Sequence, residues 1–81
     1  MKITVFEFFN ENREQYKQLV KAGAVSWLLE RNMELFEYYN KQYKETGSKM
    51  LASSITSERF KVSERTVGYV VEKMNKEITQ I

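Results

Sequence analysis

The last third of the chain carries a helical pattern of apolar positions. Within residues 64–79, apolar side chains recur at the i, i+3, i+4, i+7 and i+11 positions, which indicates one apolar stripe along an α-helix. Ser63 precedes this stretch, where its hydroxyl can accept a hydrogen bond from a backbone N–H of the first helical turn. We therefore expect a helix over residues 64–79. Its apolar stripe consists of Val67, Val70, Val71, Met74 and Ile78.

A second helical pattern precedes this one after a very short interruption. Ser48 can cap a helix that we expect over residues 49–60. Only Lys61 and Val62 lie between this helix and the cap at Ser63. Two helices joined so tightly cannot lie antiparallel side by side, so they must cross at a steep angle. The apolar bulk of the earlier helix is expected from Met50, Leu51, Ile55 and Phe60.

Residues 57–67 read SERFKVSERTV, with a small residue, an apolar residue, a short turn and a serine in a fixed order. This run resembles the helix-turn-helix pattern of bacterial DNA-binding domains, small-x-x-apolar-Gly-apolar-Ser-x-x-x-Val. The family most often has Ala where this chain has Ser57, and it favours Gly where this chain has Lys61. If the turn requires a left-handed backbone, a lysine there costs about 1 kcal/mol or more relative to glycine. The alternative is an ordinary corner between two helices, with no role in DNA binding.

The first part of the chain begins with a helix signal. Thr4 and Glu7 have the spacing of a capping box, which predicts a helix that starts at Val5. Gly23 is placed to end this helix, and Asn12 interrupts its apolar stripe, so the centre of the helix is expected to be half-buried. The stripe consists of Val5, Phe8, Phe9, Tyr16, Leu19 and Val20.

Residues 24–45 form the next helical region, which Gly47 is placed to end. The region is longer than an average helix of about 11–12 residues, and Asn32 can cap a new helix at Met33. We favour a short helix, a bend at residues 31–32 and a longer helix, with one continuous helix over residues 24–46 as the alternative. The apolar face consists of Val25, Leu28, Leu29, Phe36, Tyr39 and Tyr43, with Trp27 and Leu35 beside it.

Aromatic side chains are concentrated in the first half of the chain. Phe36, Tyr38, Tyr39 and Tyr43 offer either a platform for stacking nucleic-acid bases or a core, and their helical spacing with few neighbouring cations favours the core. Phe6 lies off the first stripe, which predicts an exposed ring. The edge of a partner surface is the alternative reading for Phe6.

The composition fits one small helical domain. The chain has 81 residues, 42% of them hydrophobic, with no proline and three glycines, so few positions interrupt a helix. We expect an all-α fold over residues 1–81, a small bundle of four or five helices. Residues 4–46 form its N-terminal helices and residues 48–79 the helix-turn-helix part. No strand pair is expected after the last helix, so the domain has no wing.

The absence of cysteine and histidine limits the chemistry that the chain can perform. Disulfides are excluded, a metal site lacks its usual soft ligands, and the commonest general base and nucleophile are missing. No phosphate-binding glycine loop is present. We expect no enzyme, no cofactor and no small-molecule substrate. Because no apolar run reaches the length of a membrane span and the start lacks a signal-peptide pattern, we expect a cytoplasmic protein.

The charge of the chain is weakly polarised toward its C-terminal part. Residues 1–47 carry seven Lys/Arg and seven Glu, whereas residues 48–81 carry six Lys/Arg and four Glu, so this part holds the whole net charge of +2. The sign suits a phosphate partner, although the excess is small.

The resemblance implies that the helix beginning at Glu64 is a recognition helix whose first turns enter the major groove. Arg65 can then donate two hydrogen bonds to guanine, and Gly68 lets the helix lie closer to the base edges. Tyr69 offers a hydroxyl for phosphate and a ring face for a thymine methyl. The residues expected at DNA are Ser63, Glu64, Arg65, Gly68, Tyr69 and Lys73, together with Lys49, Arg59 and Lys61. Of these, the four cations other than Arg65 are expected to touch phosphates, which set position without reading sequence.

We therefore expect a small protein that binds double-stranded DNA sequence-selectively, as a transcriptional regulator or an accessory factor of a mobile element. Selectivity at this size needs a dimer or a larger assembly, and the charge-balanced N-terminal helices are the expected homodimer contact. The alternative is a protein-interaction or oligomerisation module with a helix-turn-helix shape and no DNA binding. A third possibility is a packaging or recombination accessory that binds DNA only as an oligomer. A continuous basic rim would favour DNA, whereas glutamates closing over Arg65 would favour the interaction module.

Overall fold

The computed structural model describes residues 2–23 and 27–79, in which five helices form the body of the molecule. The expected all-α bundle of four or five helices is confirmed. In chain order the elements are β1 (Lys2–Thr4), α1 (Val5–Glu11), α2 (Arg13–Lys21), α3 (Trp27–Thr46), α4 (Lys49–Phe60), α5 (Glu64–Met74) and β2 (Glu77–Thr79). None of the helices in the described part of the chain is long and apolar enough to cross a membrane.

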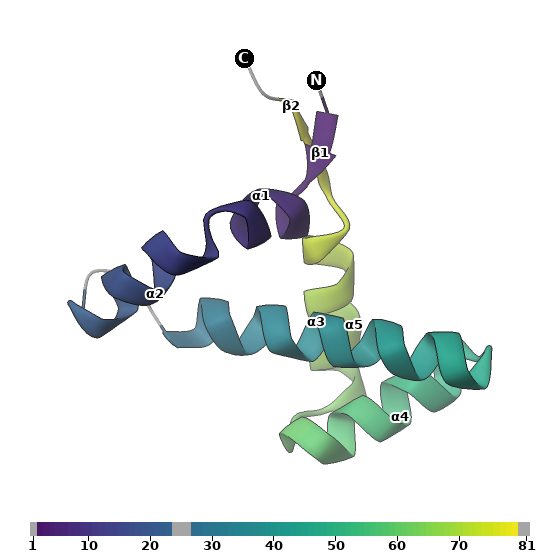
Figure 1. The fold of residues 1–81 in the computed structure, drawn as a ribbon. Helices are drawn as coiled ribbons and strands as arrows, with labels where there is room; N and C mark the ends of the chain where they lie inside the picture. Colours follow the sequence, from purple (N-terminus) through teal and green to yellow (C-terminus); the bar gives the residue numbers. More distant parts are fainter. Residues whose placement is uncertain (1, 24–26, 80–81) are drawn as a thin grey trace.

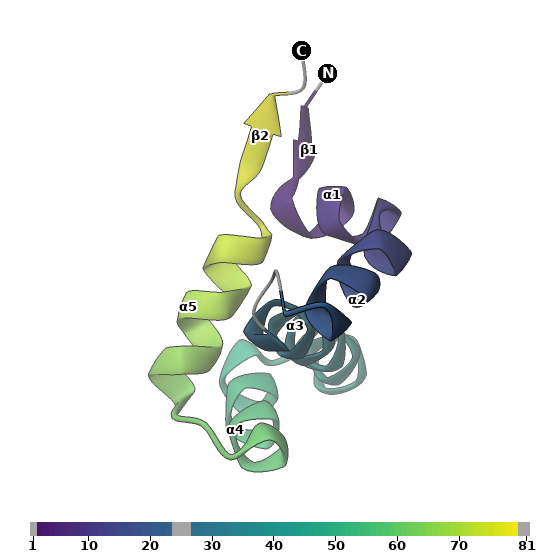
Figure 2. The same cartoon turned by 90° about the vertical axis from the view of Figure 1, so that its left-hand side faces the viewer.

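The long helix α3 lies at the centre of the bundle. It packs against α4, α5 and α2, with α4 alongside it and the α1–α2 arm on its other side (Figure 1). Helix α5 runs steeply across both α3 and α4, which two perpendicular views show (Figures 1 and 2). The core forms where these three helices meet, and its fully buried apolar residues are Met33, Leu35, Phe36, Tyr39, Ala52, Val67, Val70 and Met74.

The first helix begins as predicted but is broken in its middle. The Thr4 backbone N–H donates to Glu7 Oε1 at 3.0 Å and the Glu7 N–H donates to Thr4 Oγ1 at 3.1 Å, which confirms the capping box. At Asn12 the backbone leaves the helical region (φ −111°, ψ 23°) and its side-chain amide donates to the Phe8 carbonyl at 2.9 Å. Asn12 thus separates α1 from α2. Gly23, at φ 78°, follows the end of α2 as predicted.

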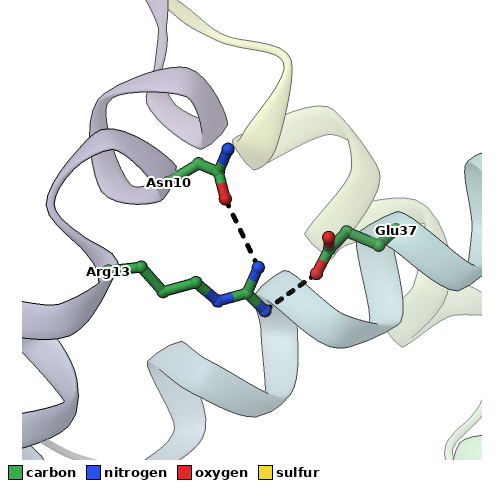
Figure 3. A network of polar contacts seen from close by, with 3 residues as sticks. All are labelled: Asn10, Arg13 and Glu37. Atoms are coloured by element: carbon green, nitrogen blue, oxygen red, sulfur yellow. Dashed lines mark hydrogen bonds and ion pairs between the residues drawn. The ribbon is translucent and has the colours of Figure 1, made fainter.

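A surface contact holds the junction of α1 and α2 against α3. Arg13 Nη2 lies 2.8 Å from Glu37 Oε1, and Arg13 Nη1 donates to Asn10 Oδ1 at 3.3 Å (Figure 3). The hydrogen bond to Glu37, together with the charge of that carboxylate, raises the pKa of Arg13. Because both side chains are partly exposed, the ion pair contributes about 0.2–1 kcal/mol and serves mainly to orient the arm.

Helix α3 is continuous over the position where a bend was favoured. Asn32 does not cap a new helix, since its side-chain oxygen accepts a hydrogen bond from Arg31 Nη2 at 2.9 Å. Met33 and Leu35 are fully buried, so packing of the helix against its neighbours stabilises an unbroken course. The predicted start at residues 24–26 lies outside the described residues. Gly47, at φ 71°, ends the helix as predicted.

The buried face of α4 differs from the one expected. Its bounds are as predicted, and Ser48 Oγ accepts from the Leu51 N–H at 3.3 Å. Met50 and Leu51, expected to supply core bulk, are instead 78% and 53% exposed. The buried positions are Ala52 and Thr56, because small side chains allow α4 to approach both α3 and α5 closely.

The last helix is shorter than predicted, and a strand follows it. Helix α5 ends at Met74, and β2 pairs antiparallel with β1, with Ile78 opposite Ile3. The Val5 N–H also donates to the Lys76 carbonyl at 2.8 Å. The helix predicted to residue 79 was therefore too long. One strand, β2, follows α5, and its partner β1 lies before α1, so the two strands do not form a wing after the last helix. The partner of β2 lies at the opposite end of the sequence, so the apolar pattern of residues 64–79 alone gives no sign of this strand.

The aromatic cluster is core only in part. Phe36 and Tyr39 are buried, Tyr38 is half-buried, and Tyr43 is exposed near the end of α3. Phe6 was expected to be exposed, but its ring centroid lies 4.8 Å from that of Phe36 and the side chain packs against the core. Neither reading of Phe6 holds, because α1 turns this ring toward α3.

Candidate nucleic-acid interface

A tight left-handed turn joins α4 to α5. Lys61 has φ 55° and ψ 46°, the left-handed backbone that the sequence pattern implied. The Val62 N–H then donates back to the Ser57 carbonyl at 3.1 Å, which satisfies one of the last carbonyls of α4. The chain therefore changes direction sharply within three residues, and Ser63 lies at the start of α5.

The start of α5 is fixed by its cap. Ser63 Oγ accepts from the Thr66 N–H at 3.1 Å and lies 3.0 Å from Thr66 Oγ1. Val62, just before the cap, packs against the core that contains Val67, as in a hydrophobic staple. Together these contacts set the direction in which α5 leaves the turn.

Helix α5 has a buried stripe and an uncovered outer face. Val67, Val70 and Met74 are buried, as predicted, while Arg65 and Tyr69 lie on the exposed side. Figure 2 shows α5 at the left edge of the bundle, with no other element of the described chain beyond it on that side. The further exposed positions of the helix are Glu64, Gly68, Glu72 and Lys73.

The exposed side chains of α5 have room to meet a partner. Among the described residues no carboxylate lies within ion-pair distance of Arg65. Tyr69 is 63% exposed, and Lys73 Nζ lies 5.8 Å from the centroid of its ring. A Cβ added at Gly68 would meet nothing within 4 Å. Packing inside this protein therefore gives no reason for a glycine in the middle of α5, where it costs about 1 kcal/mol.

The remaining predicted cations do not gather in one place. Lys49 begins α4, whereas Arg59 and Lys61 lie at its other end, about 15 Å away along the helix axis. Arg59 lies over the ring of Tyr38 with Cζ 5.8 Å from the centroid, on the side of α3. All of these side chains are exposed, but they mark two separate ends of α4 instead of a continuous rim.

Two open hollows flank α5. One is lined by Tyr69, Glu72, Lys73, Asn75 and Lys76 together with Val5 of α1. The other lies toward α3 and α4, and its lining includes Tyr43, Lys49, Gly68, Glu72 and Asn75. Glu72 and Asn75 line both hollows. Asn75 and Lys76 were not recognised as site residues from the sequence, because both fell inside the overlong helix predicted there.

Away from α5, the described part of the molecule shows only a small cleft. It has no group of three or more acidic, histidine or cysteine side chains that could hold a metal ion. The cleft between α2 and α3, lined by Tyr16 and Met33 among others, has a volume of only about 10 Å³. The exposed face of α5 and its flanking hollows are thus the best candidate for a functional surface.

Comparison of the chain with protein-family models, with curated proteins and with solved structures found no match in any of the three.

Proposed function

We propose that this chain is a small sequence-selective DNA-binding protein that places the first turns of α5 in the major groove. The observation that supports it is the uncovered outer face of α5, which a left-handed turn at Lys61 and a capped start at Ser63 hold across α4. A helix held in this way by a preceding helix is the arrangement with which helix-turn-helix domains read DNA.

The outer face of α5 contacts the base edges and so determines sequence selectivity. Arg65 donates two hydrogen bonds to guanine O6 and N7, the commonest specific contact in the major groove. Gly68 leaves space for close approach of the helix to the base edges. Tyr69 meets a thymine methyl or a phosphate, and Glu64 accepts from a cytosine amino group. Ser63 acts through the backbone, because its hydroxyl is engaged in the cap.

Four cations of α4, α5 and the turn between them hold the DNA backbone. Lys49, Arg59, Lys61 and Lys73 are exposed and free to approach phosphates. Four such contacts form a weak grip, which agrees with the net charge of only +2. The role that fits a weak selective reader is regulation of transcription, or service as an accessory factor of a mobile element, in the cytoplasm.

A homodimer through the N-terminal helices supplies the selectivity that one small reader lacks. In α1 and α2 no residue is buried. Leu19 of α2 is 40% exposed, and Trp27, the first residue of α3, is 62% exposed. A second copy that covers this arm would bury these side chains and pair two recognition helices about a twofold axis.

Titration of a labelled duplex at several salt concentrations tests the proposal. With three to four phosphate contacts, the slope of log K against log salt should be about −3 to −4. Arg65→Ala should weaken binding to a duplex selected from a random library by about 1–3 kcal/mol, and weaken binding to unselected duplex much less. The DNA-binding function is excluded if the wild-type protein does not bind any duplex at low salt.

A protein-interaction module is the second candidate, and two observations favour it. Met50 and Leu51 present apolar side chains to solvent at the first turn of α4, while Glu64 and Glu72 offset the two cations on the exposed face of α5. This function predicts that Leu51→Gln abolishes capture of a protein partner while duplex titration shows no binding to lose.

A further inference from the structure

The two hollows meet along α5, where Gly68 lines one, Tyr69 lines the other, and Glu72 and Asn75 line both. Lys49 lines the hollow toward α3 and α4, and Lys73 and Lys76 line the hollow toward α1. At least one lysine therefore lines each of the two hollows beside α5. The inference drawn from this arrangement rests on the proposed function. If α5 binds in the major groove, the positions of the hollows determine which DNA strand each lysine contacts.

A helix that enters the major groove has one sugar-phosphate backbone on each side, because the groove is about 12 Å wide and a helix with its side chains is about as broad. The two backbones would lie where the two hollows are. We propose that the hollows seat the phosphates of opposite strands, Lys49 holding one strand and Lys76, with Lys73, the other. Lys76 is a residue that neither the sequence pattern nor the helix-turn-helix resemblance assigns to DNA.

The backbone around Lys76 is held in place by the terminal strands. Its carbonyl accepts a hydrogen bond from the Val5 N–H at 2.8 Å, and β2 begins one residue later at Glu77. The exposed ammonium group is thus carried on a fixed main chain at the rim of the hollow. Because the main chain is already ordered there, only the lysine side chain loses conformational freedom when it meets a phosphate.

Glu72 weakens the clamp at both of its seats. It lines both hollows, so its carboxylate opposes the attraction of the lysines for phosphate on each side. Glu72→Gln should therefore strengthen binding to selected and unselected duplex alike, by severalfold.

The test uses the full chain and three single variants, Lys76→Gln, Lys49→Gln and the control Lys41→Gln. Lys41 is exposed on α3 and lines neither hollow. On a labelled unselected duplex, Lys76→Gln and Lys49→Gln should each reduce the salt slope by about one, and their combination by about two. Lys41→Gln removes the same charge and should leave the slope unchanged.

Phosphate-ethylation interference on a duplex selected with the wild-type protein then locates the contacts. Ethyl groups that no longer interfere in Lys76→Gln should lie on the strand opposite those that no longer interfere in Lys49→Gln. Equal behaviour of Lys76→Gln and Lys41→Gln, or both contacts on one strand, overturns the clamp while DNA binding stands. A wild-type protein that binds no duplex at low salt overturns the proposed function and the clamp together.

Discussion

Lys61 shows how a single residue shapes the candidate interface. It is the only non-glycine with positive φ among residues 2–23 and 27–79, at the point where α4 must stop and α5 must begin. A Cβ in this conformation costs about 1–2 kcal/mol. The chain keeps a lysine there nevertheless, and its side chain is exposed beside the proposed DNA surface.

Replacing Lys61 by Gly separates the backbone role of this residue from its charge. Lys61→Gly should be as stable as the wild type or up to about 1 kcal/mol more stable, because relief of strain is partly offset by the greater freedom of glycine in the unfolded chain. Binding should weaken on every duplex, with a salt slope reduced by about one. Denaturant melts and duplex titrations measure the two effects, and a clear loss of stability would argue against strain at this turn.

Thr56 is a second residue whose chemistry differs from its surroundings. It is fully buried, and its Oγ1 has no hydrogen-bond partner among the described residues. Thr56→Val keeps the shape and removes the unsatisfied hydroxyl, so we expect about 1 kcal/mol of added stability. Thr56→Ser keeps the hydroxyl and removes a methyl group, with an expected loss of about 1 kcal/mol. The urea midpoints of the two variants should fall on opposite sides of the wild-type midpoint. A shift of both midpoints in the same direction would refute the interpretation.

At the scale of elements, α5 has one face buried in the core and one face exposed to solvent. Val70 is buried mid-stripe, whereas Tyr69 next to it is largely exposed. Val70→Ala should lower the free energy of unfolding by about 1–3 kcal/mol, and Tyr69→Ala should change it by less than about 0.5 kcal/mol. Guanidinium melts of both variants decide the matter, and a larger loss for Tyr69→Ala would mean that the exposed face is needed for folding.

The elements also show which features a sequence pattern can predict. The helix starts after Thr4, Ser48 and Ser63 depend on bonds within three residues, so local signals located all three correctly. The course of α3 past Asn32 and the end of α5 at Met74 depend on distant partners, and both were predicted wrongly. Helix propensity alone does not predict the packing of α3 or the pairing of β2 with β1.

In the candidate site as well, features that depend on nearby residues were predicted and features that depend on distant residues were missed. The left-handed backbone at Lys61 and the exposure of Arg65, Gly68 and Tyr69 follow from the motif and the apolar stripe, and the structure agrees with them. Lys76 was missed because its position at the rim of a hollow depends on where α5 ends. The dispersal of the cations along α4 was missed as well, since a linear sequence does not reveal which exposed charges share one side.

At the scale of the whole molecule, the core and the N-terminal arm are packed to different degrees. Every fully buried residue of the described chain belongs to α3, α4 or α5, and the α1–α2 arm extends from these helices (Figure 1). Aromatic and aliphatic side chains of the arm are only half covered, among them Phe8 and Val20. This imbalance supports the proposed homodimer.

Sedimentation equilibrium tests the homodimer. The wild-type protein should associate reversibly, and Leu19→Gln should weaken association by about tenfold, because one exposed apolar side chain would lose its cover. Met50→Gln, a change of the same kind on α4, should leave association unaltered. A protein that stays monomeric at millimolar concentration, or equal effects of the two variants, would exclude the arm as the contact.

The short pairing of β1 with β2 also determines how this domain can be joined to others. Lys2 lies opposite Thr79, so the chain enters and leaves the helical body at neighbouring points (Figure 2). Domains with adjacent ends can be inserted into a surface loop of a host protein without stretching either partner, and they tolerate circular permutation. The same geometry allows two copies to be linked in tandem through a short connector, which would place two copies of α5, the proposed recognition helix, on one polypeptide and raise their effective local concentration at a shared partner.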